Sequence, residues 1–124
     1  MNKNRPKHLA LRQISWPLPS LVSILHRVSG LLLFLALPLL LTMLQYSLRS
    51  IETYTQLAGV LQHPVSKLLL LGLLWAFLHH LCAGIRYLAI DLDCGVGLAQ
   101  ARASSRWVLL SGLGLTVLMG VWLW

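Results

Sequence analysis

Two adjacent histidines and an arginine lie inside an apolar stretch of the chain that is long enough to cross a membrane. They are His79, His80 and Arg86, within the stretch at about 66–90. Polar side chains at such depth are costly and persist mainly where they have partners. The expected partner of a membrane-buried imidazole here is a metal, and haem iron is the leading candidate.

Helix geometry distinguishes the two histidines. Residues four and seven apart share a helix face, so His80, Gly84 and Tyr87 point the same way. His79 points about 100° away from His80, and we expect it to make packing or polar contacts. Gly84 leaves room for a flat ring one turn from His80. His80 is therefore the predicted axial ligand of the haem iron, and a bis-imidazole haem would need a second histidine from another subunit.

The first apolar stretch carries a second polar face, in the motif SILHRVSG at 23–30. Ser23, His26 and Arg27 lie on this face. Arginine pairs well with carboxylates through its fork of donors, so His26, Arg27 and Arg86 are placed to meet the haem propionates. Ser23 and Arg27, one turn apart, also suit hydrogen bonds to the carbonyl oxygens of a quinone that arrives from the lipid.

Each of these residues also has a simpler interpretation when it is taken alone. Arg27 can be an interfacial arginine whose stem lies along apolar surface while its head reaches water. His80 can be a hydrogen-bonding residue between membrane helices. Tyr87 is expected to serve packing more than chemistry.

The composition sets the class of protein that must position these side chains. The chain has 124 residues, of which 57% are hydrophobic and 10% charged, against about 25% charged in soluble domains. We predict one all-α, integral membrane domain over 1–124, embedded in a larger assembly. Its three transmembrane helices are expected at about 20–48, 66–90 and 107–124, because a spanning helix needs roughly 20 residues.

The net charge of +7 comes from Lys and Arg residues that flank the apolar stretches. This placement indicates orientation in a bilayer and does not favour a nucleic-acid partner. The segment before the first stretch carries four Lys or Arg residues, and the loop at about 91–106 carries Arg102 and Arg106. By the positive-inside rule, the N-terminus and this loop face the cytoplasm. The loop at about 49–65 would then lie on the opposite side.

The motifs together resemble those of the large cytochrome b membrane-anchor subunit of succinate dehydrogenase, the succinate:quinone oxidoreductase of respiratory complex II. The resemblance covers nearly the whole chain. It rests on SILHRVSG at 23–30, on HLCAGIRYLAID at 80–91, and on Arg5-Pro6, His8-Leu9 and Pro17-Leu18 before them. One position departs from the family, which commonly has a histidine where this chain has Tyr87.

The resemblance implies that His80 ligates haem b and that a second, smaller anchor subunit supplies the other ligand. It implies that Ser23 and Arg27 help to bind ubiquinone, that Ile24 and Trp16 line this site, and that His26 and Arg27 lie near the propionates. A flavoprotein subunit and an iron–sulfur subunit would dock on the cytoplasmic face. The chain would then reside in a bacterial inner membrane, with the mitochondrial inner membrane less favoured.

Two other functions compete with this one. The chain can be a purely structural anchor that keeps the quinone pocket without haem, or a small transporter subunit with a polar site at mid-membrane. A transporter would favour broken helices or inverted repeats, and the sequence has neither. Without a flavin motif or a set of iron–sulfur cysteines, the chain cannot oxidise succinate alone.

Overall fold

Three long helices and one short helix make up the part of the chain that a computed structural model describes, residues 16–124. The helices are α1 (Leu18–Ser47), α2 (Ile51–Gln62), α3 (Pro64–Asp91) and α4 (Leu98–Leu123). No β-strand occurs between residues 16 and 124. The all-α prediction is confirmed.

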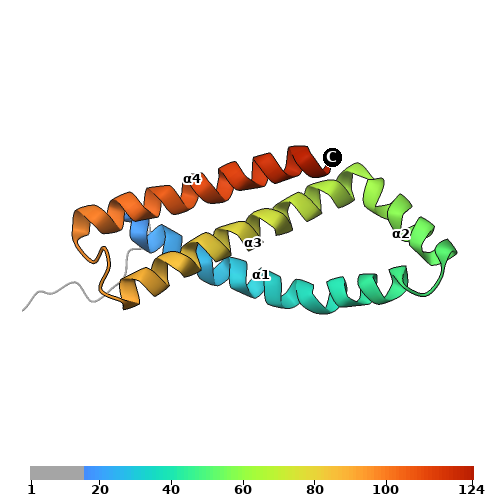
Figure 1. Cartoon of the computed structure of the whole chain (residues 1–124), viewed down its shortest axis with the longest axis horizontal. Helices are drawn as coiled ribbons and strands as arrows, with labels where there is room; N and C mark the ends of the chain where they lie inside the picture. The colour runs from blue at the N-terminus through green and yellow to red at the C-terminus, as the bar shows by residue number, and fades with distance from the viewer. Residues whose placement is uncertain (1–15) are drawn as a thin grey trace, which may run out of the picture.

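The three long helices lie side by side as an antiparallel bundle, with α2 connecting α1 to α3 at one end (Figure 1). They contain 30, 28 and 26 residues, and each is apolar and long enough to span a membrane. The prediction of three membrane helices is thus confirmed. Their contacts are largest between α3 and α4 and between α1 and α3.

The helix α4 begins earlier than the apolar pattern predicts. It starts at Leu98, whereas the apolar run starts at 107. The intervening residues include three Ala and two Arg, which favour helix without making the segment apolar enough to span a membrane. The connection from α3 is correspondingly short and turns at Asp93 and Gly95, whose φ angles are 58° and 79°. Gly95 adopts this left-handed conformation without a steric penalty.

The loop expected at about 49–65 contains the helix α2. Ser50 caps its first turn: the Thr53 N–H donates to the Ser50 hydroxyl at 3.2 Å, and the Ser50 N–H donates to the Thr53 hydroxyl at 3.1 Å. The Tyr46 hydroxyl donates to Gln56 Oε1 at 2.7 Å and ties α2 to the end of α1. The apolar pattern missed this helix because it is short and only partly apolar.

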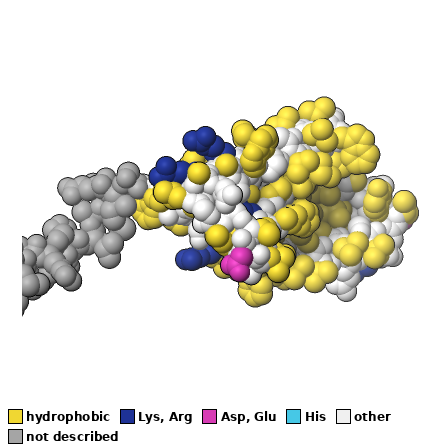
Figure 2. Space-filling view, turned by 60° about the vertical axis from the view of Figure 1, so that its left-hand side comes forward, with side chains coloured by type: hydrophobic (Ala, Val, Ile, Leu, Met, Phe, Trp, Pro, Cys, Tyr) yellow, Lys and Arg dark blue, Asp and Glu magenta, His cyan; other side chains and the backbone are white. Residues whose placement is uncertain are grey.

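The distribution of side chains is typical of a membrane protein. Apolar side chains cover most of the face seen in Figure 2, and Lys and Arg gather mainly beside the grey residues at one end. The apolar core consists of few residues, with Val22, Ala83 and Val108 packed together. The buried polar residues lie inside the bundle: Ser29, His79, Arg86, Ser105 and Thr116. Much of the outer surface therefore suits lipid or another hydrophobic protein.

Candidate functional site

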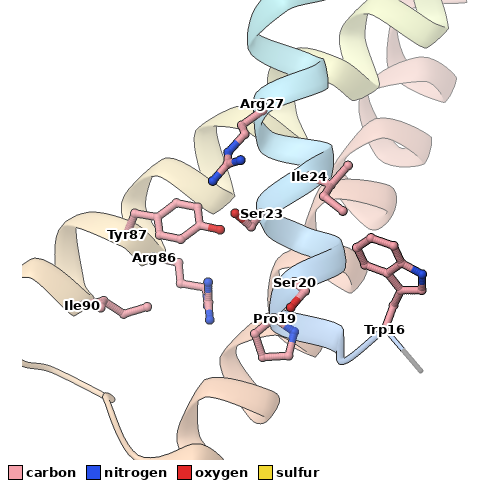
Figure 3. A pocket seen from close by; sticks show the side chains of 9 residues that line it. All are labelled: Trp16, Pro19, Ser20, Ser23, Ile24, Arg27, Arg86, Tyr87 and Ile90. Carbon is pink, nitrogen blue, oxygen red and sulfur yellow. The ribbon is translucent and has the colours of Figure 1, made fainter. Parts of the chain in front are cut away.

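Residues predicted from the sequence to act together line one pocket between α1 and α3, beside the start of α1. The pocket has a volume of about 450 Å³, and its walls include Trp16, Ser23, Ile24 and Arg27. The structure adds residues that the motifs did not assign to the same place: Pro19, Ser20, Arg86, Tyr87 and Ile90. In Figure 3, the polar groups of Ser23 and Arg27 from α1 point toward the hydroxyl of Tyr87 from α3, and the guanidinium of Arg86 lies below that ring.

The ring of His80 lies against α1, and His80 is not among the residues that line this pocket. It stacks on the ring of His26, with centroids 4.1 Å apart and planes 11° from parallel. His80 Nδ1 is 3.1 Å from the carbonyl oxygen of His26 and 3.2 Å from the hydroxyl of Ser29. The Ser29 hydroxyl also donates to the carbonyl of His26 at 2.9 Å.

These contacts indicate which tautomer of the neutral His80 ring fits this position. A carbonyl oxygen only accepts hydrogen bonds, so His80 Nδ1 must carry the proton when it bonds to His26. The other nitrogen, Nε2, then keeps its lone pair and can ligate a metal. Histidine ligands of metals commonly donate their second ring nitrogen to a carbonyl or carboxylate in this way. His80 is the histidine whose surroundings fit the predicted role.

A glycine on α1 allows His80 to approach this closely. A Cβ atom at Gly30 would lie 2.8 Å from His80 Cε1, which is closer than side chains normally come. Gly84 is less restricted, because a Cβ there would meet only His26 Nε2 at 3.8 Å. Gly84 is the glycine expected from the sequence to leave room for a ring, but the tighter requirement lies at Gly30. The sequence feature that could have indicated this role is the position of Gly30 one helical turn after His26, on the same face of the helix.

The neighbouring His79 faces α4, away from His80, as the helix register predicts. Its side chain is fully buried, and its ring lies 5.3 Å from that of Trp75. Neither ring nitrogen has a hydrogen-bond partner among the described residues. A Cβ atom at Gly112 of α4 would lie 3.3 Å from His79 Cα. His79 therefore marks the close contact between α3 and α4.

The two arginines of the pocket differ in their surroundings. Arg27 is exposed and forms no side-chain hydrogen bond with any residue in 16–124. Arg86 is buried, with 8% of its surface exposed. Its Nε donates to the Ser104 hydroxyl at 2.9 Å and its Nη2 to the Ala101 carbonyl at 3.4 Å. Arg86 thus joins the pocket to α4, a link that the sequence motifs did not reveal.

Tyr87, the position that departs from the family pattern, contacts His26 of the stacked histidine pair and also lines the pocket. Its ring lies 5.2 Å from that of His26, tilted by 54°, and forms part of the pocket wall. Its hydroxyl is buried and has no hydrogen-bond partner among residues 16–124. Packing against His26 is the kind of role expected of Tyr87 from the sequence.

The side chains at this site limit which metals and ligands it can hold. The described part of the chain has no group of three or more His, Cys, Asp or Glu side chains placed to hold a metal ion. A metal bound through His80 must therefore receive its remaining ligands from elsewhere, as an iron held in a porphyrin does. The pocket itself offers the hydroxyl groups of Ser20, Ser23 and Tyr87, two guanidinium groups and apolar walls, which suit a largely apolar ligand with polar oxygen atoms.

The chain is similar to known proteins over nearly its whole length. Residues 1–122 match the family described as "Succinate dehydrogenase/Fumarate reductase transmembrane subunit". The chain is 38% identical over 125 residues to the succinate dehydrogenase cytochrome b556 subunit of Coxiella burnetii, with full coverage of both chains. It is 30% identical over 115 residues to the subunit of the same name from Paracoccus denitrificans, covering 93% of this chain and 88% of the relative. The identity to the Rickettsia felis subunit is 31% over 114 residues, covering 92% and 87%.

Proposed function

We propose that this chain, which belongs to the succinate dehydrogenase/fumarate reductase transmembrane subunit family, binds haem b and forms part of a ubiquinone-reduction site. Family membership makes it a membrane-anchor cytochrome b subunit of succinate dehydrogenase. The observation that carries the finer proposal is the pairing of His80 with the His26 carbonyl, beside a pocket lined by Ser23 and Arg27.

The residues around His80 fit a haem. Its Nδ1 is held by the His26 carbonyl, so Nε2 is free to ligate iron. Haem b, when bound, supplies a centre that accepts and gives up single electrons. Arg27 would hold the propionates, since it lines the side of α1 that faces α3 and a guanidinium pairs well with carboxylates, and the neighbouring His26 would lie near them. A second, smaller anchor subunit would supply the other imidazole.

The pocket fits a quinone head group. Its volume of about 450 Å³ falls in the range of small-molecule sites. Ser23 and Arg27 would donate hydrogen bonds to the carbonyl oxygens, which gain negative charge as electrons arrive. Trp16 and Ile24 would supply apolar contacts to the ring. Full reduction takes two electrons and two protons per quinone, and a site near the start of α1 would draw these protons from nearby water.

The orientation and partners follow from charge and from the family. The end of the bundle with most Lys and Arg would face the cytoplasm, which places the N-terminus and the α3–α4 connection there. An iron–sulfur subunit would dock on this side and deliver electrons, and a flavoprotein subunit bound to it would oxidise succinate. The membrane would be a bacterial inner membrane.

The haem-less anchor is the alternative that an optical experiment separates from this proposal. The whole complex is purified, and the dithionite-reduced minus oxidised spectrum is recorded. We expect the absorption bands of a b-type haem. Their absence, together with intact quinone reduction, would overturn the haem proposal and leave the structural anchor with a quinone pocket. The transporter alternative has no support in the family to which the chain belongs.

A further inference from the structure

We propose that α4 takes part in the quinone site: Ser104 is a positioning residue that holds Arg86 as the second cation of the pocket. This inference rests on the proposed function, because it names a further group of the same site. No motif placed α4 at the site, and its role comes from a contact that only the folded bundle brings about.

The first observation is the geometry of the contact. Arg86 Nε donates to the Ser104 hydroxyl at 2.9 Å, and Arg86 Nη2 donates to the Ala101 carbonyl at 3.4 Å. The Ser104 hydroxyl gives its own proton to the same carbonyl, at 3.2 Å. Since this hydrogen bond orients the hydroxyl, an oxygen lone pair is available to Arg86. One turn of α4 thus holds one edge of the guanidinium and fixes its direction.

The second observation concerns the part of Arg86 that α4 does not hold. Its Nη1 forms no hydrogen bond with any residue between 16 and 124, and Arg86 lines the same pocket as Arg27. In Figure 3, the guanidinium of Arg86 lies below the ring of Tyr87, on the side of the pocket that faces the start of α1. The free donors are therefore in a position to meet a ligand.

The third observation is the charge of the pocket. Its lining residues include two arginines and no carboxylate, and residues 16–124 form no salt bridge with either arginine. A buried charge is retained where partners compensate its lost hydration. Two like charges beside one pocket favour an occupant with negative or partly negative oxygens. A quinone that is being reduced meets this requirement, because negative charge develops on its carbonyl oxygens.

The competing interpretation gives Arg86 a structural role only, as a bond between α3 and α4. This role predicts lower thermal stability of a variant without any change in its affinity for quinone. The positioning role predicts a higher KM for quinone. The two are separated by measuring kcat and KM for a water-soluble ubiquinone analogue, succinate oxidation with an artificial dye, and the haem spectrum of the same complex.

The test uses the whole complex with Ser104→Ala, which removes the Nε acceptor. We expect KM for the quinone analogue to rise about tenfold, the effect of losing a hydrogen bond to a charged group. Dye reduction and the haem spectrum should stay unchanged. Ser104→Thr keeps the hydroxyl and should restore KM. Arg86→Lys should raise KM at least as much as Ser104→Ala, because a lysine cannot bond α4 and the ligand with one planar fork.

The matched control is Ser111→Ala, on the same helix. Among residues 16–124, the Ser111 hydroxyl donates only to carbonyls of its own helix, at Trp107 and Val108, so this variant should keep the parental KM. Arg27→Lys tests the proposed function separately. A raised KM in Arg27→Lys with an unchanged or lower KM in Ser104→Ala would overturn the positioning role alone. An unchanged KM in both variants would overturn the quinone site as well.

Discussion

The imidazole rings of His26 and His80 stack nearly parallel across the contact between α1 and α3, with centroids 4.1 Å apart. The backbone of the same His26 accepts the hydrogen bond from His80 Nδ1. One residue of α1 thus fixes both the plane of the predicted ligand and its tautomer. Such an outer contact is how proteins orient histidine ligands before a metal binds.

The adjacent histidines provide a direct test of register. His80→Ala removes the predicted iron ligand and should abolish or strongly alter the b-type haem spectrum of the complex. His79→Ala leaves the ligand in place, because His79 faces α4, and should retain the spectrum. Loss of haem in His79→Ala with retention in His80→Ala would show that the assigned register is wrong.

Gly30 should be more sensitive to substitution than its small size suggests. In Gly30→Ala the new methyl group would lie 2.8 Å from His80 Cε1, so the ring must move and lose its bond to the His26 carbonyl. We expect haem content to fall by at least half, with the complex still assembled. Gly72→Ala is the control, since a Cβ there meets nothing within 4 Å. Equal haem content in the two variants would contradict this account.

The α1 donors of the pocket can be tested by kinetics. Ser23→Ala and Arg27→Leu each remove a donor that faces the pocket. Quinone reduction should fall by about tenfold or more, because a hydrogen bond to a charged or developing charged group is lost. Succinate oxidation by an artificial dye should continue at the parental rate. If quinone reduction by both variants equals that of the parent, the assignment of the site fails.

Adding a side chain at Gly112, where α4 packs closely on α3, should lower the stability of the complex. A Cβ atom at this position would lie 3.3 Å from the backbone of His79, whereas one at Gly114 meets nothing within 4 Å. Crowding of this kind costs about 1 kcal/mol or more, so the melting temperature of the purified complex should fall in Gly112→Ala. Gly114→Ala should leave it unchanged or raise it slightly, since alanine favours helix over glycine. A lower melting temperature in Gly114→Ala alone would refute this packing.

Local spacing along one helix was enough to predict part of this site. The positions of Ser23, His26 and Arg27 on one face of α1, and of His80 on α3, follow from the helical repeat. Trp16 and Ile24 joined them through the family resemblance. The structure places Trp16, Ser23, Ile24 and Arg27 around one pocket. The three membrane helices could also be predicted from the sequence. A long apolar run that crosses a bilayer must satisfy its backbone hydrogen bonds without water, as a helix does.

Features that depend on how helices cross could not be read from the sequence. The bond between Arg86 and Ser104 joins residues of different helices, and nothing in their spacing predicts it. The greater restriction at Gly30 than at Gly84 depends on how closely α1 approaches α3. The helix α2 was missed for a different reason: it is short, its first turn is held by the Ser50 cap, and its apolar pattern is weak.

The shortage of buried residues on α1 bears on how the subunit is made and removed in the cell. Of its 30 residues, only Val22 and Ser29 are buried, while side chains such as Phe34 and Leu35 are more than half exposed. In a newly inserted copy, α1 would contact the other helices through few residues until another subunit covers its exposed face. Copies made in excess of that subunit should therefore be the ones that membrane proteases degrade first.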